Sequence, residues 1–254
     1  LVDLRSAGIA ASAGHRADAL PAETEALVVS TAIADDNPEL RAARERGLPV
    51  LHRADLLAEL MASRQGLAVA GAHGKSTTSA MLWLALGDAS ACIGATIAGG
   101  HGTGAIWGEG PWFVAEADES DRSLLKLAPQ AAILLNVDHD HHATYASIDE
   151  VQEVFRAFVA QLPTDGLLVV GDDPRAREVA KAASCPVWVV GESDDADITV
   201  STGDESAVLR DRLGTEVEVR LSVPGRHNHT NAACAVGLAQ WCGVDPDVAA
   251  ARLS

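Results

Sequence analysis

The stretch Leu67-Ala-Val-Ala-Gly-Ala-His-Gly-Lys-Ser-Thr-Thr78 decides the fold, because an apolar run breaks there into a glycine-bounded turn that carries Lys75 and Ser76. We expect a short buried strand before Gly71 and a helix over residues 76–86. In that order, the unpaired N–H groups at the helix start point at one spot. A lysine and a hydroxyl beside such a spot can hold outer phosphates and a magnesium ion. The segment therefore predicts a phosphate-binding loop.

This loop is shorter than the usual pattern, because Val69 stands where the first glycine is normally found. A Gly-x-x-Gly-Lys-Ser string also occurs by chance, so the alternative is an exposed glycine-rich turn with an incidental lysine. A strand before the turn and a helix after it are what phosphate binding requires. The flanking pattern therefore favours the phosphate-binding loop.

The composition is that of a folded chain, with 254 residues of which 48% are hydrophobic. A formal net charge of −17 argues against nucleic-acid binding, which depends on clustered Lys and Arg. No apolar run approaches the length of a membrane span, and the amino terminus has no signal-peptide pattern, so a cytoplasmic location without membrane association is expected. The four cysteines are scattered without paired spacing, and we expect reduced thiols.

Short apolar runs alternate with helical patterns, which predicts an α/β fold with a mostly parallel sheet. We expect strands over residues 112–115, 131–135, 167–170 and 187–190. The period-two pattern of residues 216–222 predicts a small antiparallel addition to this sheet. A final helix is expected from about Asn228 to Trp241.

The polar residues 63–66 predict a domain boundary, with one domain over residues 1–64 and a second over residues 65–254. The first offers a strand at residues 27–30, a helix opened by Asn37 and Pro38, and a short helix over residues 54–61. Because so few strands cannot form an independent sheet, we expect only part of a Rossmann-like domain. The join at residues 86–88 is short for a helix-to-strand connection, which suggests omitted residues.

Acidic side chains follow the strand that ends at Ala115, in the string Glu116-Ala-Asp-Glu-Ser-Asp121. The carboxyl ends of parallel strands are where such proteins place their sites. Carboxylates there can hold magnesium beside a phosphate loop. The alternative is a solvated acidic loop in an acidic protein.

A histidine-rich string, Asn136-Val-Asp-His-Asp-His-His142, follows the next strand along the chain. A zinc site is one interpretation, but ligands one and two residues apart on an irregular segment do not converge on one ion. A single histidine that joins Glu116 on a magnesium ion is the more modest hypothesis.

Two asparagines, Asn228 and Asn231, lie three residues apart at the start of the last predicted helix. Side chains at this spacing share a helix face, and their amides can read a planar base. Asn228 could equally cap the helix.

Four motifs in order, at residues 71–78, 116–121, 136–145 and 225–231, resemble those of the Mur ligases of peptidoglycan synthesis. The resemblance covers nearly the whole chain. It implies that residues 1–64 are part of a UDP-sugar-binding domain, that residues 65–254 are the central ATP-binding domain, and that the family's carboxy-terminal domain is absent. On this basis, the chain alone is not expected to complete a ligation.

The resemblance implies ATP and Mg²⁺ as cofactors and assigns roles by matching position. Lys75 would contact the outer phosphates, Ser76 and Glu116 would hold one magnesium ion, and His141 would hold a second. The implied catalytic residues are Lys75, Glu116 and His141. The implied ATP-binding residues are Gly71, Ala72, His73, Gly74, Lys75, Ser76, Thr77, Asn228 and Asn231.

Within the family, the string at residues 116–121 looks most like the branch that joins L-alanine to the carboxylate of UDP-N-acetylmuramate through an acyl phosphate. The nearest rival is a recycling ligase that attaches a preformed peptide, although such enzymes usually have tyrosine where Ser120 stands. Two further hypotheses are a nucleotide-binding module without turnover and a zinc protein. The sequence does not indicate an oligomeric state.

Overall fold

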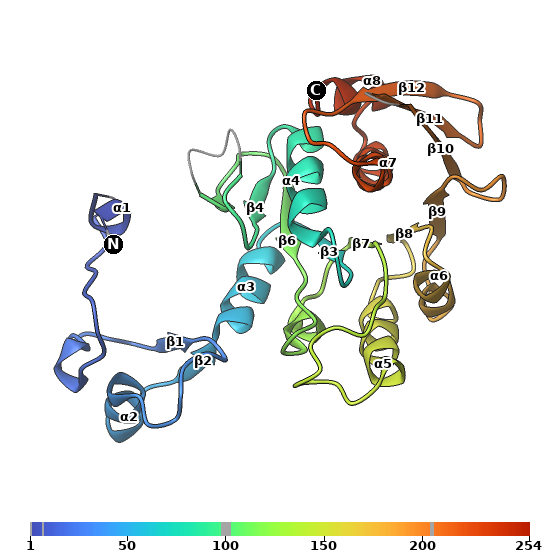
Figure 1. Ribbon diagram of the computed structural model, residues 1–254. Helices are drawn as coiled ribbons and strands as arrows, with labels where there is room; N and C mark the ends of the chain where they lie inside the picture. Colours follow the sequence, from blue (N-terminus) through green and yellow to red (C-terminus); the bar gives the residue numbers. More distant parts are fainter. Residues whose placement is uncertain (1, 7, 98–102, 204–205) are drawn as a thin grey trace. The chain divides into compact units, whose positions relative to one another are not determined.

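The computed structural model describes residues 2–6, 8–97, 103–203 and 206–254 (Figure 1). The chain divides into two compact units, residues 1–57 and residues 58–254. The division lies inside helix α3 (Arg53–Ala62), a few residues before the polar segment at which the sequence predicts the boundary.

The first unit is built around a parallel pair of short strands, β1 (Leu27–Val29) and β2 (Val50–His52), joined by helix α2 (Pro38–Glu45). The side chain of Asn37 caps α2, because its Oδ1 accepts the N–H groups of the second and third helical residues at 2.9 and 3.2 Å. A short helix α1 (Val2–Ser6) and a 3₁₀ turn (Ala17–Ala19) precede the pair. This strand–helix–strand arrangement confirms the predicted part of a Rossmann-like fold.

The second unit contains a ten-stranded sheet in the order β12-β11-β10-β9-β8-β7-β3-β6-β4-β5. In this order, the neighbours from β10 through β9, β8, β7, β3 and β6 to β4 pair in parallel. Strands β5, β11 and β12 pair antiparallel at the two edges. The predicted mostly parallel sheet with a small antiparallel addition is therefore confirmed. The strands are β3 (Gln65–Ala70), β4 (Ser90–Cys92), β5 (Ala105–Ile106), β6 (Trp112–Glu116), β7 (Ala131–Leu134), β8 (Leu167–Gly171), β9 (Val187–Gly191), β10 (Ile198–Thr202), β11 (Ser206–Asp211) and β12 (Glu216–Arg220).

Helices cover both faces of this sheet (Figure 1). Helices α4 (Lys75–Leu86), α7 (Arg226–Trp241) and α8 (Pro246–Ala251) share one core with alternate strand residues such as Leu67 and Val69. Helices α5 (Ile148–Val159) and α6 (Pro174–Ala180) cover the other face, and a 3₁₀ turn spans Ser123–Lys126. Because both faces are covered, β3 reads as a continuous apolar run. In the described part of the chain, no helix is long and apolar enough to cross a membrane.

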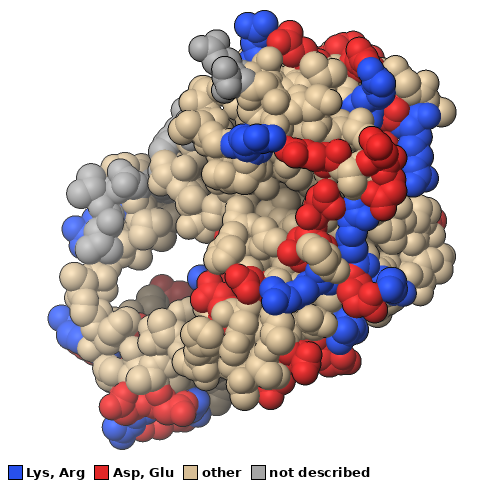
Figure 2. Space-filling view, turned by 45° about the vertical axis from the view of Figure 1, so that its right-hand side comes forward, with Lys and Arg blue, Asp and Glu red and all other residues tan. Residues whose placement is uncertain are grey.

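Charged side chains of both signs are mixed on the face shown in Figure 2. Asp and Glu outnumber Lys and Arg by 36 to 19 along the chain, so the basic side chains lie among acidic ones. Nucleic-acid sites need clustered basic residues instead. On this face the two signs are interspersed among uncharged residues.

The end of the chain differs from the prediction in two places. Helix α7 begins at Arg226, two residues before the predicted start, and helix α8 follows Gly243, where the sequence predicts no further helix. The missed signal is the pair Asp245 and Pro246, since Asp245 Oδ1 accepts two N–H groups of the first turn.

The short join after α4 is closed by residues 87–89, and Gly87 adopts a φ of +83° that a glycine tolerates.

Arg252 links the end of α8 to the end of α4, because its guanidinium donates to the carbonyls of Ala85 at 2.7 Å and Leu86 at 3.0 Å. These carbonyls have no partner within the helix, and a cation at a helix carboxyl end is favourable. We expect Arg252→Ala to lower the free energy of unfolding by about 1–3 kcal/mol. Urea unfolding measures the change. The exposed Arg220→Ala is the control, and an equal loss in both variants would contradict the capping role.

Candidate functional site

The phosphate-loop candidate lies at the middle of the sheet, because β3 is flanked by β6 on one side and β7 on the other. Residues 71–74 connect β3 to α4. Gly71 has a φ of +138° and Gly74 a φ of +86°, values that side-chain-bearing residues rarely adopt. A Cβ on Gly71 would also lie 3.2 Å from the backbone nitrogen of Asn136. Both glycines are therefore required by the backbone and by close approach of the next loop.

Lys75 begins α4 and folds back over its own loop. Its Nζ donates to the carbonyl of Gly71 at 2.7 Å and to Oε1 of Glu119 at 3.0 Å, and it lies 2.9 Å from Oε2 of the same carboxylate. The two side chains are 12% and 3% exposed. This ion pair is thus nearly buried, and Lys75 must exchange a partner before it can contact a phosphate.

Ser76 faces the carboxylate at the end of β6. Its hydroxyl lies 3.1 and 3.0 Å from the two carboxylate oxygens of Glu116, one of which also accepts the N–H of Gly94 at 2.9 Å. A hydroxyl and a carboxylate supply the hard oxygen ligands that Mg²⁺ prefers. The residue pair that the sequence proposes for magnesium is therefore brought together and fits that ion chemically.

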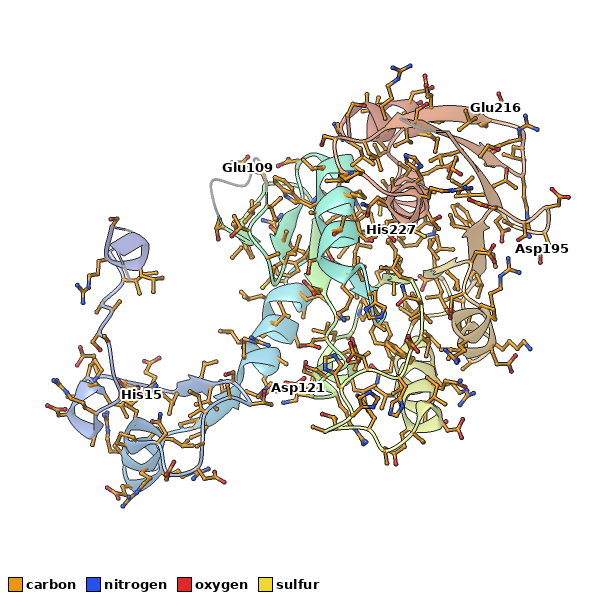
Figure 3. All side chains as sticks on the ribbon, in the orientation of Figure 1. His15, Glu109, Asp121, Asp195, Glu216 and His227 are labelled. Carbon is orange, nitrogen blue, oxygen red and sulfur yellow. The ribbon has the colours of Figure 1, made fainter. Side chains whose placement is uncertain are left out.

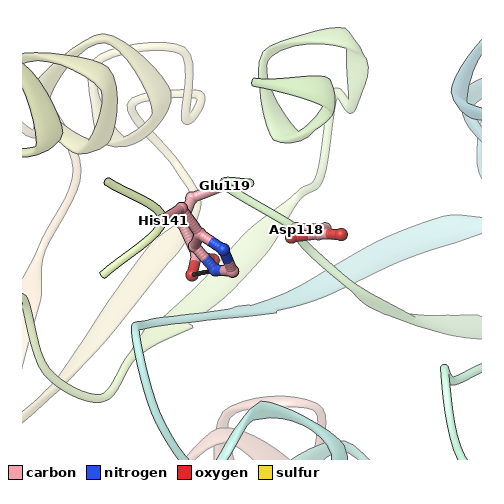
Figure 4. A group of neighbouring side chains, drawn as sticks. All are labelled: Asp118, Glu119 and His141. Carbon is pink, nitrogen blue, oxygen red and sulfur yellow. Dashed lines mark ion pairs between the residues drawn. The ribbon is translucent and has the colours of Figure 1, made fainter. Parts of the chain in front are cut away.

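His141 lies next to Glu119, as Figure 4 shows, with its Nε2 3.3 Å from Oε1 of that carboxylate. Together with Asp118 they offer ligand atoms within 4.8 Å of one another, the one such group found among the described residues. The sequence proposes one histidine of this string beside Glu116, and the resemblance assigns His141 to a second magnesium ion. In the structure, the carboxylate at ion-pair distance from His141 is that of Glu119.

The remaining histidines of the string point elsewhere. The rings of His139 and His142 contact each other edge to face at 4.4 Å between centroids, and Nε2 of His139 lies 3.1 Å from the carbonyl of Tyr145. His139 and His142 are thus not part of the group that Asp118, Glu119 and His141 form. His141 has a φ of +55°, in the left-handed region that few residues other than glycine adopt.

Hydrogen bonds tie the histidine-bearing loop to the acidic loop. The hydroxyl of Tyr145 donates to the carbonyl of Glu119, and Oγ1 of Thr144 donates to the carbonyl of Ser120 at 2.8 Å. Tyr145 is 1% exposed, and burial raises the pKa of its hydroxyl. The backbone N–H of His141 and then its imidazole charge lower the pKa of Asp140. These bonds fix His141 relative to Glu119, a role for Tyr145 that the sequence does not indicate.

The amides of Ala72 and His73 are turned toward Asn136. The N–H of Ala72 donates to the backbone carbonyl of Asn136 at 3.2 Å, and the N–H of His73 donates to its Oδ1 at 2.8 Å. Both residues are predicted to bind ATP, but these two amides already have acceptors in this conformation. The amides of residues 74–77 remain at the loop and the first turn of α4, where a phosphate is expected.

Asn228 and Asn231 lie on the first two turns of α7, the helix that carries His227, which is labelled in Figure 3, and each is 8% exposed. The side chain of Asn228 donates to the carbonyl of Pro224 at 2.7 Å and accepts from Asn231 at 3.2 Å. Asn228 therefore does not cap α7, since Gly225 occupies that position. A Cβ on Gly74 would lie 3.2 Å from Nδ2 of Asn231, so this asparagine borders the loop. Contact with adenine stays a prediction.

Family models match most of this chain. The model described as "Mur ligase middle domain" matches residues 109–239, just over half of the chain. The model described as "Mur ligase family, catalytic domain" matches residues 2–65. The second match ends where the sequence predicts a domain boundary.

Two solved structures share the fold. A UDP-N-acetylmuramate:L-alanyl-gamma-D-glutamyl-meso-diaminopimelate ligase from Neisseria meningitides superposes with a TM-score of 0.89 at 25% identity, covering 99% of this chain and 85% of that one. A UDP-N-acetylmuramate-alanine ligase from Thermotoga maritima superposes with a TM-score of 0.83 at 24% identity, covering 99% and 59%.

Curated relatives are closer in sequence. The UDP-N-acetylmuramate–L-alanine ligase of Rubrobacter xylanophilus is 44% identical over 255 residues, which is 98% of this chain and 57% of that enzyme. The enzyme of the same name from Streptomyces coelicolor is 45% identical over 95% of this chain and 54% of its own length. The chain thus spans somewhat more than half the length of these relatives. From the family-model match and these identities together, the chain belongs to the Mur ligase family.

Proposed function

We propose that this chain is the nucleotide-binding part of a ligase that uses ATP to join L-alanine to the carboxylate of UDP-N-acetylmuramate in peptidoglycan precursor synthesis. The observation that carries the proposal is the meeting of Lys75, Ser76, Glu116, Glu119 and His141 at the carboxyl ends of β3, β6 and β7. The relatives at 44% and 45% identity bear the name of that activity. Residues 1–64 would contribute part of the UDP-sugar site, and residues 65–254 the ATP site.

The reaction needs positioning and charge neutralisation more than a covalent residue. A carboxylate oxygen of the muramic acid attacks the terminal phosphorus of ATP, the bond to ADP breaks, and an acyl phosphate forms. The amine of L-alanine then attacks the acyl carbon, and inorganic phosphate leaves with the loss of one amine proton. Both steps bring anions together, so preorganised positive charge and N–H groups lower the barrier.

Each residue of the site has a defined part in this proposal. The amides of residues 74–77 and the ammonium of Lys75 would bind the phosphates once Lys75 leaves Glu119. Ser76 and Glu116 would hold one Mg²⁺, and His141 with Glu119 would hold a second. Magnesium, when bound, neutralises phosphate charge and aligns the terminal phosphoryl group. Asn228 and Asn231 are proposed to border the adenine.

A second candidate is the recycling ligase that adds a preformed peptide, because the structural neighbour with a TM-score of 0.89 carries that name. We expect free L-alanine to support ATP-dependent phosphate release on the order of 10²-fold faster than the L-alanyl-γ-D-glutamyl-meso-diaminopimelate peptide. The measurement uses the full-length protein with UDP-N-acetylmuramate, and a reaction without acceptor is the control. Preference for the peptide would favour recycling, and no release with either acceptor would remove both functions.

A further inference from the structure

The phosphate-loop backbone is held by one residue of the neighbouring loop, Asn136. Its side-chain amide makes a reciprocal pair with His73, because Oδ1 accepts the N–H of His73 at 2.8 Å and Nδ2 donates to the carbonyl of His73 at 3.0 Å. Its own carbonyl accepts the N–H of Ala72 at 3.2 Å. One residue therefore satisfies three polar groups on two consecutive residues of a four-residue loop.

Asn136 is itself anchored on both sides. The N–H of Leu135 donates to the carbonyl of Ala70 at 3.0 Å, which extends the pairing of β7 with β3 to the residue before Asn136. The N–H of Val137 donates to Oδ1 of Asp173, the residue that caps α6. Leu135 and Val137 are buried, with 5% and 1% exposure. The side-chain amide that bonds to the loop is thus carried by a buried segment that is hydrogen-bonded to the sheet.

The hydrogen bonds from Asn136 determine the orientation of the peptide groups in the loop. With the N–H groups of Ala72 and His73 bonded to Asn136, the N–H groups of Gly74 and of the first turn of α4 are those left for a phosphate. Glycine at position 71 permits this, because any Cβ there would press on the backbone of Asn136. Without the side-chain amide of Asn136, a loop that contains two glycines with positive φ could adopt many other conformations.

We propose that Asn136 is a positioning residue that keeps the phosphate loop in its binding conformation before nucleotide arrives. The inference rests on the proposed binding of ATP at this loop. A loop that is only partly in its competent conformation binds with an affinity reduced by that fraction. Loss of two side-chain hydrogen bonds is expected to weaken ATP binding about 10- to 100-fold. Because the side chain of Asn136 does not touch the reacting atoms, the KM for ATP should rise while kcat changes by less than about threefold.

The test compares the wild type with Asn136→Ala in the full-length protein, by calorimetric titration with a non-hydrolysable ATP analogue and Mg²⁺ and by steady-state kinetics. Asp245→Ala is the matched control, because it also removes two hydrogen bonds between a side chain and the backbone in the same unit. We expect the control to bind the analogue normally. Equal affinity in Asn136→Ala and the wild type would overturn the inference, whereas no binding by the wild type would overturn the proposed function instead.

Hydrogen exchange provides a readout that does not depend on the variant folding or on catalysis. In the nucleotide-free wild type, the amide protons of Ala72 and His73 are expected to exchange slowly, and those of Ser76 and Thr77 quickly. Fast exchange at Ala72 and His73 in the folded wild type would refute the positioning role of Asn136. In a folded Asn136→Ala, the protection of His73 is expected to disappear.

Discussion

Replacing Lys75 with alanine is expected to abolish ATP turnover by the full-length enzyme while leaving the fold intact. The ammonium belongs to the first residue of α4 and lies 2.9 Å from Oε2 of Glu119, at the loop where the phosphates are proposed to bind. Removal of a single donor to developing negative charge typically costs about 10²–10³-fold in kcat. Phosphate release at saturating substrates measures the rate, and circular dichroism with thermal unfolding measures the fold.

Lys181→Ala is a matched control, because Lys181 also pairs with a glutamate but its side chain is 72% exposed. Exposed pairs contribute little, so this variant should keep the wild-type rate. Lys75→Arg is not expected to rescue, since a planar guanidinium does not replace a compact ammonium in a site that leaves 12% of the side chain exposed. Turnover near the wild-type rate in Lys75→Ala would remove the phosphate-contact role.

Replacing Glu116 with glutamine is expected to raise the magnesium concentration needed for half-maximal turnover at least tenfold and to lower kcat on the order of 10²-fold. The substitution keeps the shape and one oxygen beside the hydroxyl of Ser76, but it removes the charge that a hard cation needs. The check is a magnesium titration of phosphate release at saturating ATP.

Glu153→Gln is the control, because Glu153 lies on α5 with its side chain 75% exposed and pairs only with Arg156 in the described contacts. We expect its magnesium dependence to match the wild type. If Glu116→Gln and the wild type show the same half-saturating magnesium concentration, Glu116 is not a metal ligand. The Ser76–Glu116 contact would then be explained as a helix-terminus hydrogen bond alone.

Local signals predicted much of the fold. The Asn37-Pro38 pair predicts a helix start through short-range capping, and the structure confirms it. Apolar runs predicted the central strands because strands covered on both faces need no polar alternation. Helix α8 has the same cap and proline signal at Asp245 and Pro246, although the sequence prediction ends the last helix at about Trp241.

Contacts between distant segments were harder to predict. Glu119 meets Lys75 across 44 residues of sequence, and Asn136 meets His73 across 63. Both contacts follow from the strand order, in which β3 lies between β6 and β7 although neither follows it directly along the chain. Periodicity indicates that strands exist but does not give their lateral order. The sequence therefore identified the motifs, whereas the partners of Glu119 and Asn136 came from the topology.

The buried pair of Lys75 and Glu119 has an electrostatic consequence for ligand entry. Before nucleotide arrives, the carboxylate of Glu119 neutralises the ammonium, and Asp118 and Glu116 add negative charge nearby. Under the proposed function, a free polyphosphate would meet carboxylates of its own sign here, whereas a nucleotide already complexed with a divalent cation would bring the countercharge and release the lysine. The site would then favour the metal complex over the free anion.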